Sequence, residues 1–284
     1  MECTVIYNFE EIERDDNAEI ISQNTANTWQ PDRRSGEILA NTEQGKIAEN
    51  AVIKYIQENS SNIVYLSYDE FRSDNFEKHA PFDGLIFNKE KVSETTKNTF
   101  IEKINAFISQ NPYGKISSAL RKEMEDNFIY TVEIKSTKVN DKKHNASGIS
   151  SYDKIEEVQL LINEILNDDF LTYPLYIRSG NMSWFEYCEY AKTRILSFNE
   201  LQGETLYVAV KNLELSCMAT FYIRVYIDYK FSKILIMGFI NKEELLNPPF
   251  IKKMVQPGKS EMALYFAKNL NNRKKIKDLL KTLN

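Results

Sequence analysis

The sequence contains few of the residues that many enzymes use for catalysis or for cross-linking. It has only three cysteines, with no CxxC pair, and two histidines, His79 and His144. This small number excludes a disulfide framework and a Cys/His zinc site. It also argues against a Ser/His or Cys/His hydrolase, because histidine is the usual general base in those enzymes. Any chemistry is therefore expected to come from carboxylates and lysines.

Long apolar runs are lacking as well. No stretch approaches the roughly 18 uninterrupted apolar residues that a membrane-spanning helix needs. The N-terminal residues turn acidic where a signal peptide would carry a basic start and an apolar run. These features predict a cytoplasmic protein with no membrane partner. Nine glycines and seven prolines leave no room for a long disordered or fibrous segment, and 42% hydrophobic residues are enough for a sizeable core.

The net charge of −5 neither indicates nor excludes nucleic-acid binding. A protein that contacts phosphates normally has a basic surface. However, a site that collects carboxylates around a metal ion adds negative charge of its own. Only local patches of such a protein need to be basic.

Apolar periodicity and turn residues divide the chain into helices and strands. Helical spacing is clearest in residues 36–59 and 152–166, and the clearest strand is 128–139. Residues 1–35 show little periodicity and are interpreted as an N-terminal arm, while the polar residues 89–127 are expected to form a two-helix insertion. Further strands are expected at 60–72, 79–88, 172–179, 205–213, 219–228 and 233–240, and further helices at 241–246 and 261–284.

These elements predict one domain of mixed secondary structure. No internal repeat or low-complexity linker interrupts residues 1–284, so a single domain is the simplest interpretation. Strands 60–72 and 79–88 could pair as a hairpin. Helices before, between and after the strands predict the α/β (α+β) class, with a mixed β-sheet core flanked by helices.

The strand 128–139 carries an acid and a lysine two positions apart. Side chains alternate across a strand, so Glu133 and Lys135 are expected on one face as near neighbours. Carboxylates are hard oxygen ligands that suit Mg²⁺, and a nearby ammonium can stabilise negative charge or position a water molecule. The pair therefore indicates phosphodiester hydrolysis. A salt bridge on the solvent face of a sheet is the alternative interpretation.

A second carboxylate is needed, because one alone holds Mg²⁺ only loosely. Asp83 begins the preceding expected strand, and its neighbour Gly84 allows another backbone or a ligand to come close. Glu49 lies beside the apolar stripe of the helix 36–59 and could supply a third oxygen ligand or orient a water molecule. A plain turn at Asp83 and a solvated helix charge at Glu49 are the alternatives.

The order of these residues resembles that of the PD-(D/E)xK nuclease superfamily, whose fold is restriction-endonuclease-like. A helix carries Glu49, a later strand carries Asp83, and the next strand carries Glu133-Ile134-Lys135 before a further helix. The resemblance covers residues 36–180. The stretch between the two acidic strands is long, and an insertion at 89–127 accounts for it, because loop length raises the entropy of closure only slowly.

The resemblance implies a role for each matching residue. Asp83 and Glu133 would bind Mg²⁺, with Mn²⁺ as an alternative ion, and the backbone carbonyl of Ile134 would help. Glu49 would be the accessory acid that many members place on the first core helix. Lys135 would assist the nucleophilic water.

Two other acid-x-Lys triplets compete with this assignment. Asp141-Lys142-Lys143 lies in a polar loop, whereas Asp228-Tyr229-Lys230 follows a strand and has Glu214 as an upstream acid. We prefer Glu133 because its partner Asp83 lies on a credible strand and because helices precede and follow in the expected order.

Residues beyond the acidic strand could contact the substrate. Lys138, Lys142 and Lys143 are candidates for phosphate contacts, although a basic loop is usually only solvated. Gln159 could face the site or the surface. His79 is interpreted as a loop residue and not as a ligand.

The sequence thus predicts a Mg²⁺-dependent DNA endonuclease of restriction-enzyme type, which would act as a homodimer if it cuts both strands. A repair, phage-defence or recombination nuclease would share these features. Two alternatives stay open: a catalytically silent nucleic-acid-binding or assembly module with the same fold, and a different enzyme built around Asp228 and Lys230.

Overall fold

The structure of the protein is a computed structural model that describes residues 4–13, 23, 35–111, 115–255 and 262–284. The chain forms two compact units. The first, unit 1, takes its described residues from Met1–Ile165, Ala219–Phe239 and Arg273–Asn284; unit 2 takes them from Leu166–Met218 and Ile240–Asn272. The region expected as a single domain therefore contains two such units.

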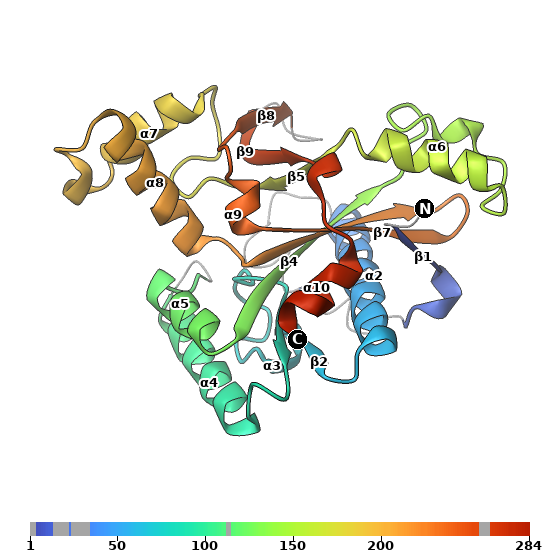
Figure 1. The fold of residues 1–284 in the computed structure, drawn as a ribbon, viewed down its shortest axis with the longest axis horizontal. Coiled ribbons are helices and arrows are strands. Elements are labelled where there is room, and N and C mark those ends of the chain that lie inside the picture. Colours follow the sequence, from blue (N-terminus) through green and yellow to red (C-terminus); the bar gives the residue numbers. More distant parts are fainter. Residues whose placement is uncertain (1–3, 14–22, 24–34, 112–114, 256–261) are drawn as a thin grey trace. The chain divides into compact units, whose positions relative to one another are not determined.

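Unit 1 is built around a mixed β-sheet whose described strands follow the order β1-β7-β6-β4-β3-β2 (Figure 1). Strands β4 and β6 pair in parallel, whereas β1 with β7, β2 with β3, and β3 with β4 pair antiparallel. The sheet and its helices confirm the predicted α/β (α+β) class. The strands are β1 (Val5–Asn8), β2 (Ile63–Ser67), β3 (Gly84–Asn88), β4 (Ile129–Lys138), β6 (Phe221–Asp228) and β7 (Lys233–Asn241).

One face of this sheet packs against α2 (Ser35–Asn59) and α10 (Ile276–Leu283). The apolar residues of α2 recur at three- and four-residue spacing, which places them on one side of the helix. Full burial of such a side chain contributes about 1.5–3 kcal/mol. The core on this face includes Ala48, Val52, Tyr55 and Ile56 from α2, Ile86, Val132, Ile223 and Ile236 from the sheet, and Leu279 and Leu283 from α10.

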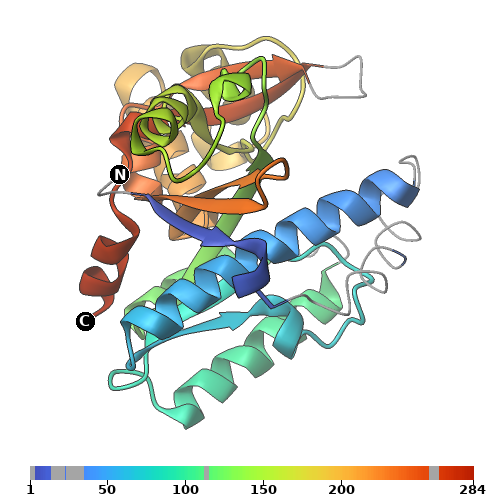
Figure 2. The same cartoon turned by 90° about the vertical axis from the view of Figure 1, so that its right-hand side faces the viewer.

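The opposite face packs against α4 (Glu94–Gln110) and α5 (Ser118–Asp126), the two helices predicted within 89–127. Figure 2 shows α2 and α4 on opposite sides of β2 and β3. Ser93 and Ser117 cap the two helices by accepting backbone N–H groups of their first turns. The core here includes Phe100, Ile104 and Ile108 from α4, Leu120 and Met124 from α5, and Leu85, Phe87 and Ile129 from the sheet.

Two more α-helices belong to unit 1. Helix α3 (Tyr68–Phe71) follows β2 directly, within the segment expected as one strand, 60–72. Helix α6 (Ile155–Ile165) follows β4 and a polar loop, as the periodicity of 152–166 predicted.

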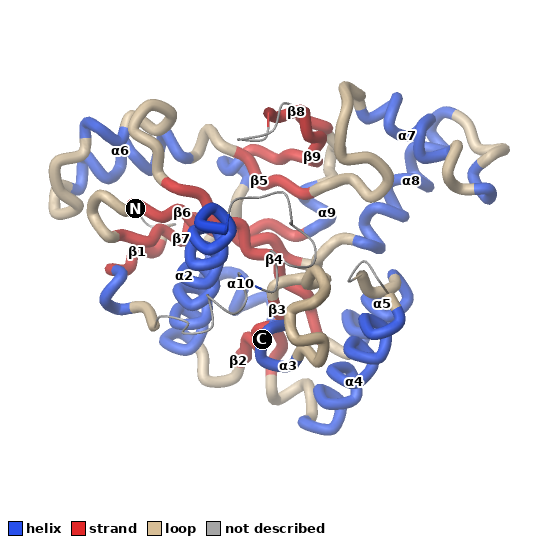
Figure 3. Tube along the Cα trace, turned by 180° about the vertical axis from the view of Figure 1, so that it is seen from behind, coloured by secondary structure: helices blue, strands red, loops and turns tan. Residues whose placement is uncertain are grey.

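Unit 2 contains a three-stranded sheet with the order β5-β9-β8 among its described residues (Figure 3). Strand β9 pairs antiparallel with both neighbours. Aromatic side chains of α7 and β9 pack together, with Trp184 and Tyr187 both in edge contact with Phe266. The elements are β5 (Asp169–Thr172), α7 (Trp184–Lys192), α8 (Gly203–Cys217), α9 (Lys242–Leu245), β8 (Ile251–Val255) and β9 (Met262–Asn269).

The prediction of a strand at 205–213 was wrong, because this segment belongs to helix α8. Its Tyr, Val and Leu content favoured a strand. The buried residues are Leu206, Val210 and Glu214, which are spaced by four as on one side of a helix. Packing within unit 2 thus overrides the local β propensity.

The prediction of one helix over 261–284 was wrong for the first part of that segment. Strand β9 occupies its first part, and only α10 at its end is a helix. The expected arm at 1–35 contributes β1, which pairs with β7 at the edge of the sheet. The loop expected around Trp29 lies outside the described residues. The strand expected at 172–179 is also misplaced, since β5 ends at Thr172.

No helix in the described part of the chain is both long enough and apolar enough to cross a membrane.

Candidate functional site

Strand β4 presents Glu133 and Lys135 together, as the two-residue period predicts. The two side chains form an ion pair and are 22% and 41% exposed. Val132 and Ile134 alternate with them and pack into the core beneath α2. Glu133 and Lys135 therefore lie on the face of the sheet opposite to α2.

Asp83 lies at the end of the β3/β4 ladder and is held there by its own backbone. Its N–H donates to the Val132 carbonyl (3.0 Å), and its carbonyl accepts the N–H of Tyr68 (2.9 Å). The ladder ends at the pair Gly84 and Val132. Beyond that pair, Oδ2 of Asp83 accepts the N–H of Ile134 (2.5 Å). The carboxylate thus accepts an N–H that the carbonyl of a neighbouring strand would otherwise accept. This N–H belongs to the middle residue of the Glu133-Ile134-Lys135 triplet.

The charges around Asp83 are concentrated and predominantly negative. Burial raises the pKa of Asp83 well above its usual value, and the negative charge of Glu133 raises it further. Lys135 opposes this effect, and Glu49 adds to it. Burial lowers the pKa of Lys135, but the charges of Glu133 and Asp83 outweigh burial and raise it overall. The other three predicted residues, Glu133, Lys135 and Glu49, therefore all act electrostatically on Asp83.

Gly84 lets the ring of Tyr65 pack directly on the chain beside Asp83. A Cβ at position 84 would lie 2.7 Å from Cε1 of Tyr65, closer than real carbon contacts allow. The hydroxyl of Tyr65 donates to Oε1 of Glu49 (3.1 Å). Burial and the charge of Glu49 raise the pKa of Tyr65 well above its usual value. The close approach expected at Gly84 is therefore made by the side chain of Tyr65, which also binds Glu49.

Glu49 is buried and accepts three side-chain donors. Oε1 accepts the hydroxyls of Tyr65 and Ser67 (2.8 Å from Ser67), and Oε2 accepts Nζ of Lys46 (2.8 Å). Lys46 also forms an ion pair with Asp69. These contacts tie α2 to β2 and α3. Glu49 therefore approaches Asp83 through Tyr65, and its role as a metal ligand stays a prediction.

Arg121, a buried residue of α5 that was not predicted as a site residue, contacts both acidic segments. Nη1 donates to Oγ1 of Thr131, and Nη2 donates to the carbonyl of Pro81, each at 3.1 Å. Thr131 and Pro81 each lie two residues before an acid, Glu133 and Asp83 respectively. The spacing of Leu120 and Met124 on α5 was the available signal, because it places position 121 beside the buried stripe.

The donor set at this site suits Mg²⁺. Asp83 and Glu133 offer carboxylate oxygens, and Ile134 offers a carbonyl. The described residues contain no group of three or more His, Cys, Asp or Glu side chains arranged for a metal, but Mg²⁺ in enzymes is usually held by one or two carboxylates plus water and phosphate oxygens. Burial first, and the charge of Glu133 second, raise the pKa of Asp83 by making its ionised form unfavourable, and a nearby cation would offset this.

Comparison of the chain with protein-family models, curated proteins and solved structures found no match. Functional inference therefore rests on the chemistry of the residues and on their arrangement.

The basic residues predicted to contact phosphates lie at the end of β4 and in the loop after it. Lys138 is exposed, and its ammonium lies 5.1 Å from the centre of the Tyr229 ring. Lys142 and Lys143 are also exposed, and their backbone N–H groups donate to Oδ1 of Asn140. Their contact with nucleic acid stays a prediction.

The competing triplet has a structural role. Oδ1 of Asp228 accepts the backbone N–H groups of Lys230 and Phe231, and Oδ2 accepts the hydroxyl of Tyr152 (2.9 Å). Nζ of Lys230 donates to the carbonyl of Ile149 (3.3 Å). These bonds close the turn after β6.

The upstream acid of that triplet, Glu214, lies in unit 2. It accepts the N–H of Leu175 and the hydroxyl of Tyr187 there. Its carboxylate fastens α8 to neighbouring segments of the same unit.

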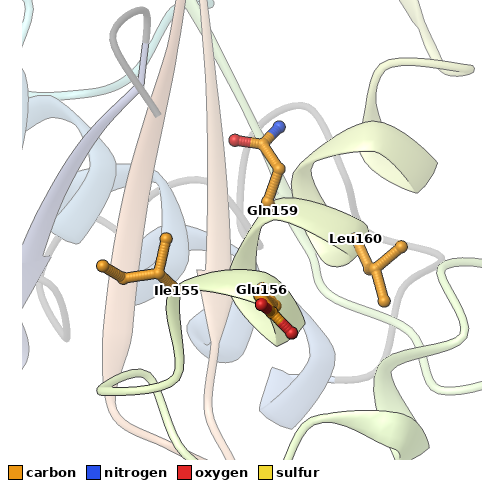
Figure 4. Close-up of a pocket in the computed structure, with 4 residues that line it drawn as sticks. All are labelled: Ile155, Glu156, Gln159 and Leu160. Atoms are coloured by element: carbon orange, nitrogen blue, oxygen red, sulfur yellow. The ribbon is translucent and has the colours of Figure 1, made fainter.

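The remaining polar candidates lie at the surface. Nδ1 of His79 contacts the carbonyl of Ala80 (2.6 Å), and Gln159 donates to Oδ1 of Asn163 (2.9 Å). Gln159 belongs to a shallow hollow of about 500 Å³ on α6, lined by Ile155, Glu156, Gln159 and Leu160 (Figure 4).

Proposed function

We propose that this protein is a Mg²⁺-dependent DNA endonuclease of restriction-enzyme type that hydrolyses phosphodiester bonds. The observation that carries the proposal is the position of the Asp83 carboxylate. It ends the β3/β4 ladder by binding the Ile134 N–H, next to the Glu133–Lys135 ion pair. Two acids from separate segments and one ammonium thus occupy one end of a strand pair, which is the arrangement that metal-assisted phosphoryl chemistry uses.

Asp83, Glu133 and the carbonyl of Ile134 would hold the Mg²⁺ ion, or Mn²⁺ in its place. The bound ion supplies positive charge that polarises a phosphate oxygen. The protein's contribution is to fix the two carboxylates. Asp83 is fixed by backbone bonds on both sides and by Ile134, so it needs no rearrangement to bind a cation.

Lys135 would orient the water that attacks the phosphorus in line with the leaving oxygen. Its pKa is raised, so the side chain stays a cation, and it acts by hydrogen bonding and by charge and not as a base. In the resting protein its partner is Glu133. Binding of a divalent cation to Glu133 would free the ammonium for the water and the phosphate.

Glu49 would act mainly by positioning. Its bond to Tyr65 fixes the ring that packs on Gly84, and this contact holds the segment that carries Asp83. A direct oxygen contact to the ion would require Glu49 to give up Lys46 or one of its hydroxyl donors.

DNA is the proposed substrate, with Lys138, Lys142 and Lys143 as contacts to its phosphates and a homodimer as the form that cuts both strands. Repair and phage-defence nucleases would use the same arrangement of catalytic residues, so the proposal does not separate these pathways.

A digest of supercoiled DNA tests the proposal. With Mg²⁺, the wild-type protein should give nicked or linear products. Glu133→Ala and Lys135→Ala should each lower the rate by about 10²-fold or more, because the first removes a proposed ligand of the ion and the second removes a positive charge that stabilises the transition state. Glu123→Ala, which removes an exposed acid of α5, is the matched control and should cut at the wild-type rate.

Other outcomes would overturn the proposal. Cleavage retained in both site variants but lost in Asp228→Ala would move the site to β6. Binding of DNA without cleavage in either Mg²⁺ or Mn²⁺ would indicate the silent binding module.

A further inference from the structure

Arg224 is a buried cation next to the candidate site that neither the sequence analysis nor the proposed mechanism uses. It lies on β6, directly across from Lys135 in the parallel register of β4 and β6. Residues paired in this way share a face of the sheet. Arg224 is therefore on the same face as Glu133 and Lys135, in a strand whose other residues are mostly apolar.

The guanidinium of Arg224 has too few partners for its burial. The residue is only 7% exposed. Nη2 donates to Oγ1 of Thr137 (2.6 Å), and the group lies 5.1 Å from the centre of the Tyr226 ring. Among the described residues, Nε is buried without an acceptor and no carboxylate forms an ion pair with Arg224. A buried charge is unfavourable unless a group of opposite charge, from the protein or from a ligand, lies beside it.

The groups that face Arg224 do not supply that charge. Lys135, its neighbour across the strands, is another cation. Glu133 is the nearest acid along that face, and it is already paired with Lys135. The proposed divalent ion would bind Glu133 and Asp83, the two acids whose charges act on Lys135, and would draw both away from the two cations. An anionic ligand is the missing component.

We propose that Arg224, with Lys135 beside it, binds a phosphate group of the nucleic-acid backbone at the candidate site. The proposal rests on the proposed function for the identity of the phosphate carrier. The guanidinium has a planar set of donors that matches two oxygens of a phosphate, and Nε lies on the edge used for such paired contacts. Thr137 accepts one N–H of Nη2 and helps to fix the orientation of the group, and Nη2, which shares that edge with Nε, carries a second N–H for the ligand. Lys135, whose side chain is 41% exposed, is the more accessible of the two cations.

Thermal unfolding in EDTA tests the anion site without any metal or cleavage. Inorganic phosphate should raise the melting temperature of the full chain more than chloride of equal ionic strength, because a ligand of the native state stabilises it. In Arg224→Met this extra increment should disappear. Phosphate also stabilises proteins nonspecifically, so the comparison is between variants and not between salts alone.

Two further variants make the result specific. Lys103→Gln removes an exposed cation from α4 and should keep the wild-type increment. Arg224→Lys keeps the charge but loses the planar donors, so it should fold and show a smaller increment. In chloride, Arg224→Met should be at least as stable as the wild type, because it removes an uncompensated charge. Equal phosphate increments in the wild type, Arg224→Met and Arg224→Lys would overturn the proposal.

A labelled DNA oligonucleotide, titrated in EDTA and followed by fluorescence anisotropy, identifies the phosphate carrier. Arg224→Met should weaken its binding by about tenfold or more, the usual effect of losing a charge-assisted contact, and Lys103→Gln should not. An increment from inorganic phosphate with unchanged DNA affinity would overturn the backbone assignment.

The two proposals fail separately. Arg224-dependent binding by a protein that never cleaves DNA would refute the nuclease and keep the anion site. Cleavage at the wild-type rate by Arg224→Met would refute the anion site and keep the nuclease.

Discussion

At the scale of single residues, Asp83 is the side chain whose environment differs most from that of an ordinary surface acid. It is held by three hydrogen bonds that involve its own atoms and lies beside the charges of Glu133 and Lys135. The sequence could identify it as a candidate from its place before a strand. The sequence could not show that the carboxylate ends the β3/β4 ladder, because that depends on where pairing stops.

The raised pKa of Asp83 predicts a distinct pH dependence of stability. In the folded protein Asp83 keeps its proton to higher pH than in the unfolded chain, where its pKa is about 3.9. Between these two pKa values the native state binds more protons, so the contribution of Asp83 to stability is lost as pH rises through the folded value. Asp83→Asn cannot ionise and can still accept the Ile134 N–H.

Thermal melts in EDTA should therefore show Asp83→Asn melting a few degrees above the wild type at pH 8. The difference should shrink as the pH falls towards 4. Asp126→Asn, at an exposed position of α5, should show no such trend. A lower melting temperature for Asp83→Asn at pH 8 would mean that the negative charge stabilises the metal-free fold.

At the scale of elements, the strongest periodic patterns were predicted well and the apolar segments of mixed character were not. Helix α2 and strands β4, β6 and β7 lie where their patterns indicated. Segment α8 was predicted as a strand and β9 as part of a helix, because both carry apolar and aromatic residues that fit either structure. Only packing partners from distant parts of unit 2 decide between helix and strand in such segments.

The site residues could likewise be predicted only where the signal is local in the sequence. Glu133 and Lys135 were predictable because alternation along a strand is local. The burial of Arg121 and the missing partner of Arg224 depend on neighbours across the sheet. Arg224 was visible in principle, as a charged residue in the apolar segment FYIRVYID. The proposal for Arg224 rests on its lack of a carboxylate partner among the described residues.

Replacement of glycine by alanine is expected to change the free energy of unfolding in opposite directions at Gly84 and at Gly45. Gly84→Ala would force a Cβ into the ring of Tyr65 and should lower the free energy of unfolding by about 1–3 kcal/mol. Gly45 lies inside α2, and a Cβ there would meet nothing within 4 Å. Gly45→Ala should raise the free energy of unfolding by about 0.5–1 kcal/mol, because alanine favours the helix.

Urea unfolding of both variants measures these effects, with the free energies extrapolated to water. An unchanged free energy for Gly84→Ala would show that Tyr65 can move away, and the proposed link from Glu49 to the Asp83 segment would then be loose.

At the scale of the whole molecule, the net charge of −5 is compatible with a nuclease only if positive charge is local. Lys135, Arg224 and the exposed lysines after β4 supply such charge in unit 1. The fold class was predictable from the order of elements. The division into two units was not, because unit 2 is assembled from two separate stretches with no change in composition at their ends.

Binding of a divalent cation is the most direct test of the account, since every proposed step of the hydrolysis requires Asp83 and Glu133 to share one ion. Mn²⁺ can be titrated into the metal-free protein and its free fraction followed by electron paramagnetic resonance. The wild type and Asp126→Asn should bind Mn²⁺ with equal affinity, whereas Asp83→Asn and Glu133→Gln should each bind it at least about tenfold more weakly. Equal Mn²⁺ affinity in all four proteins would contradict the account.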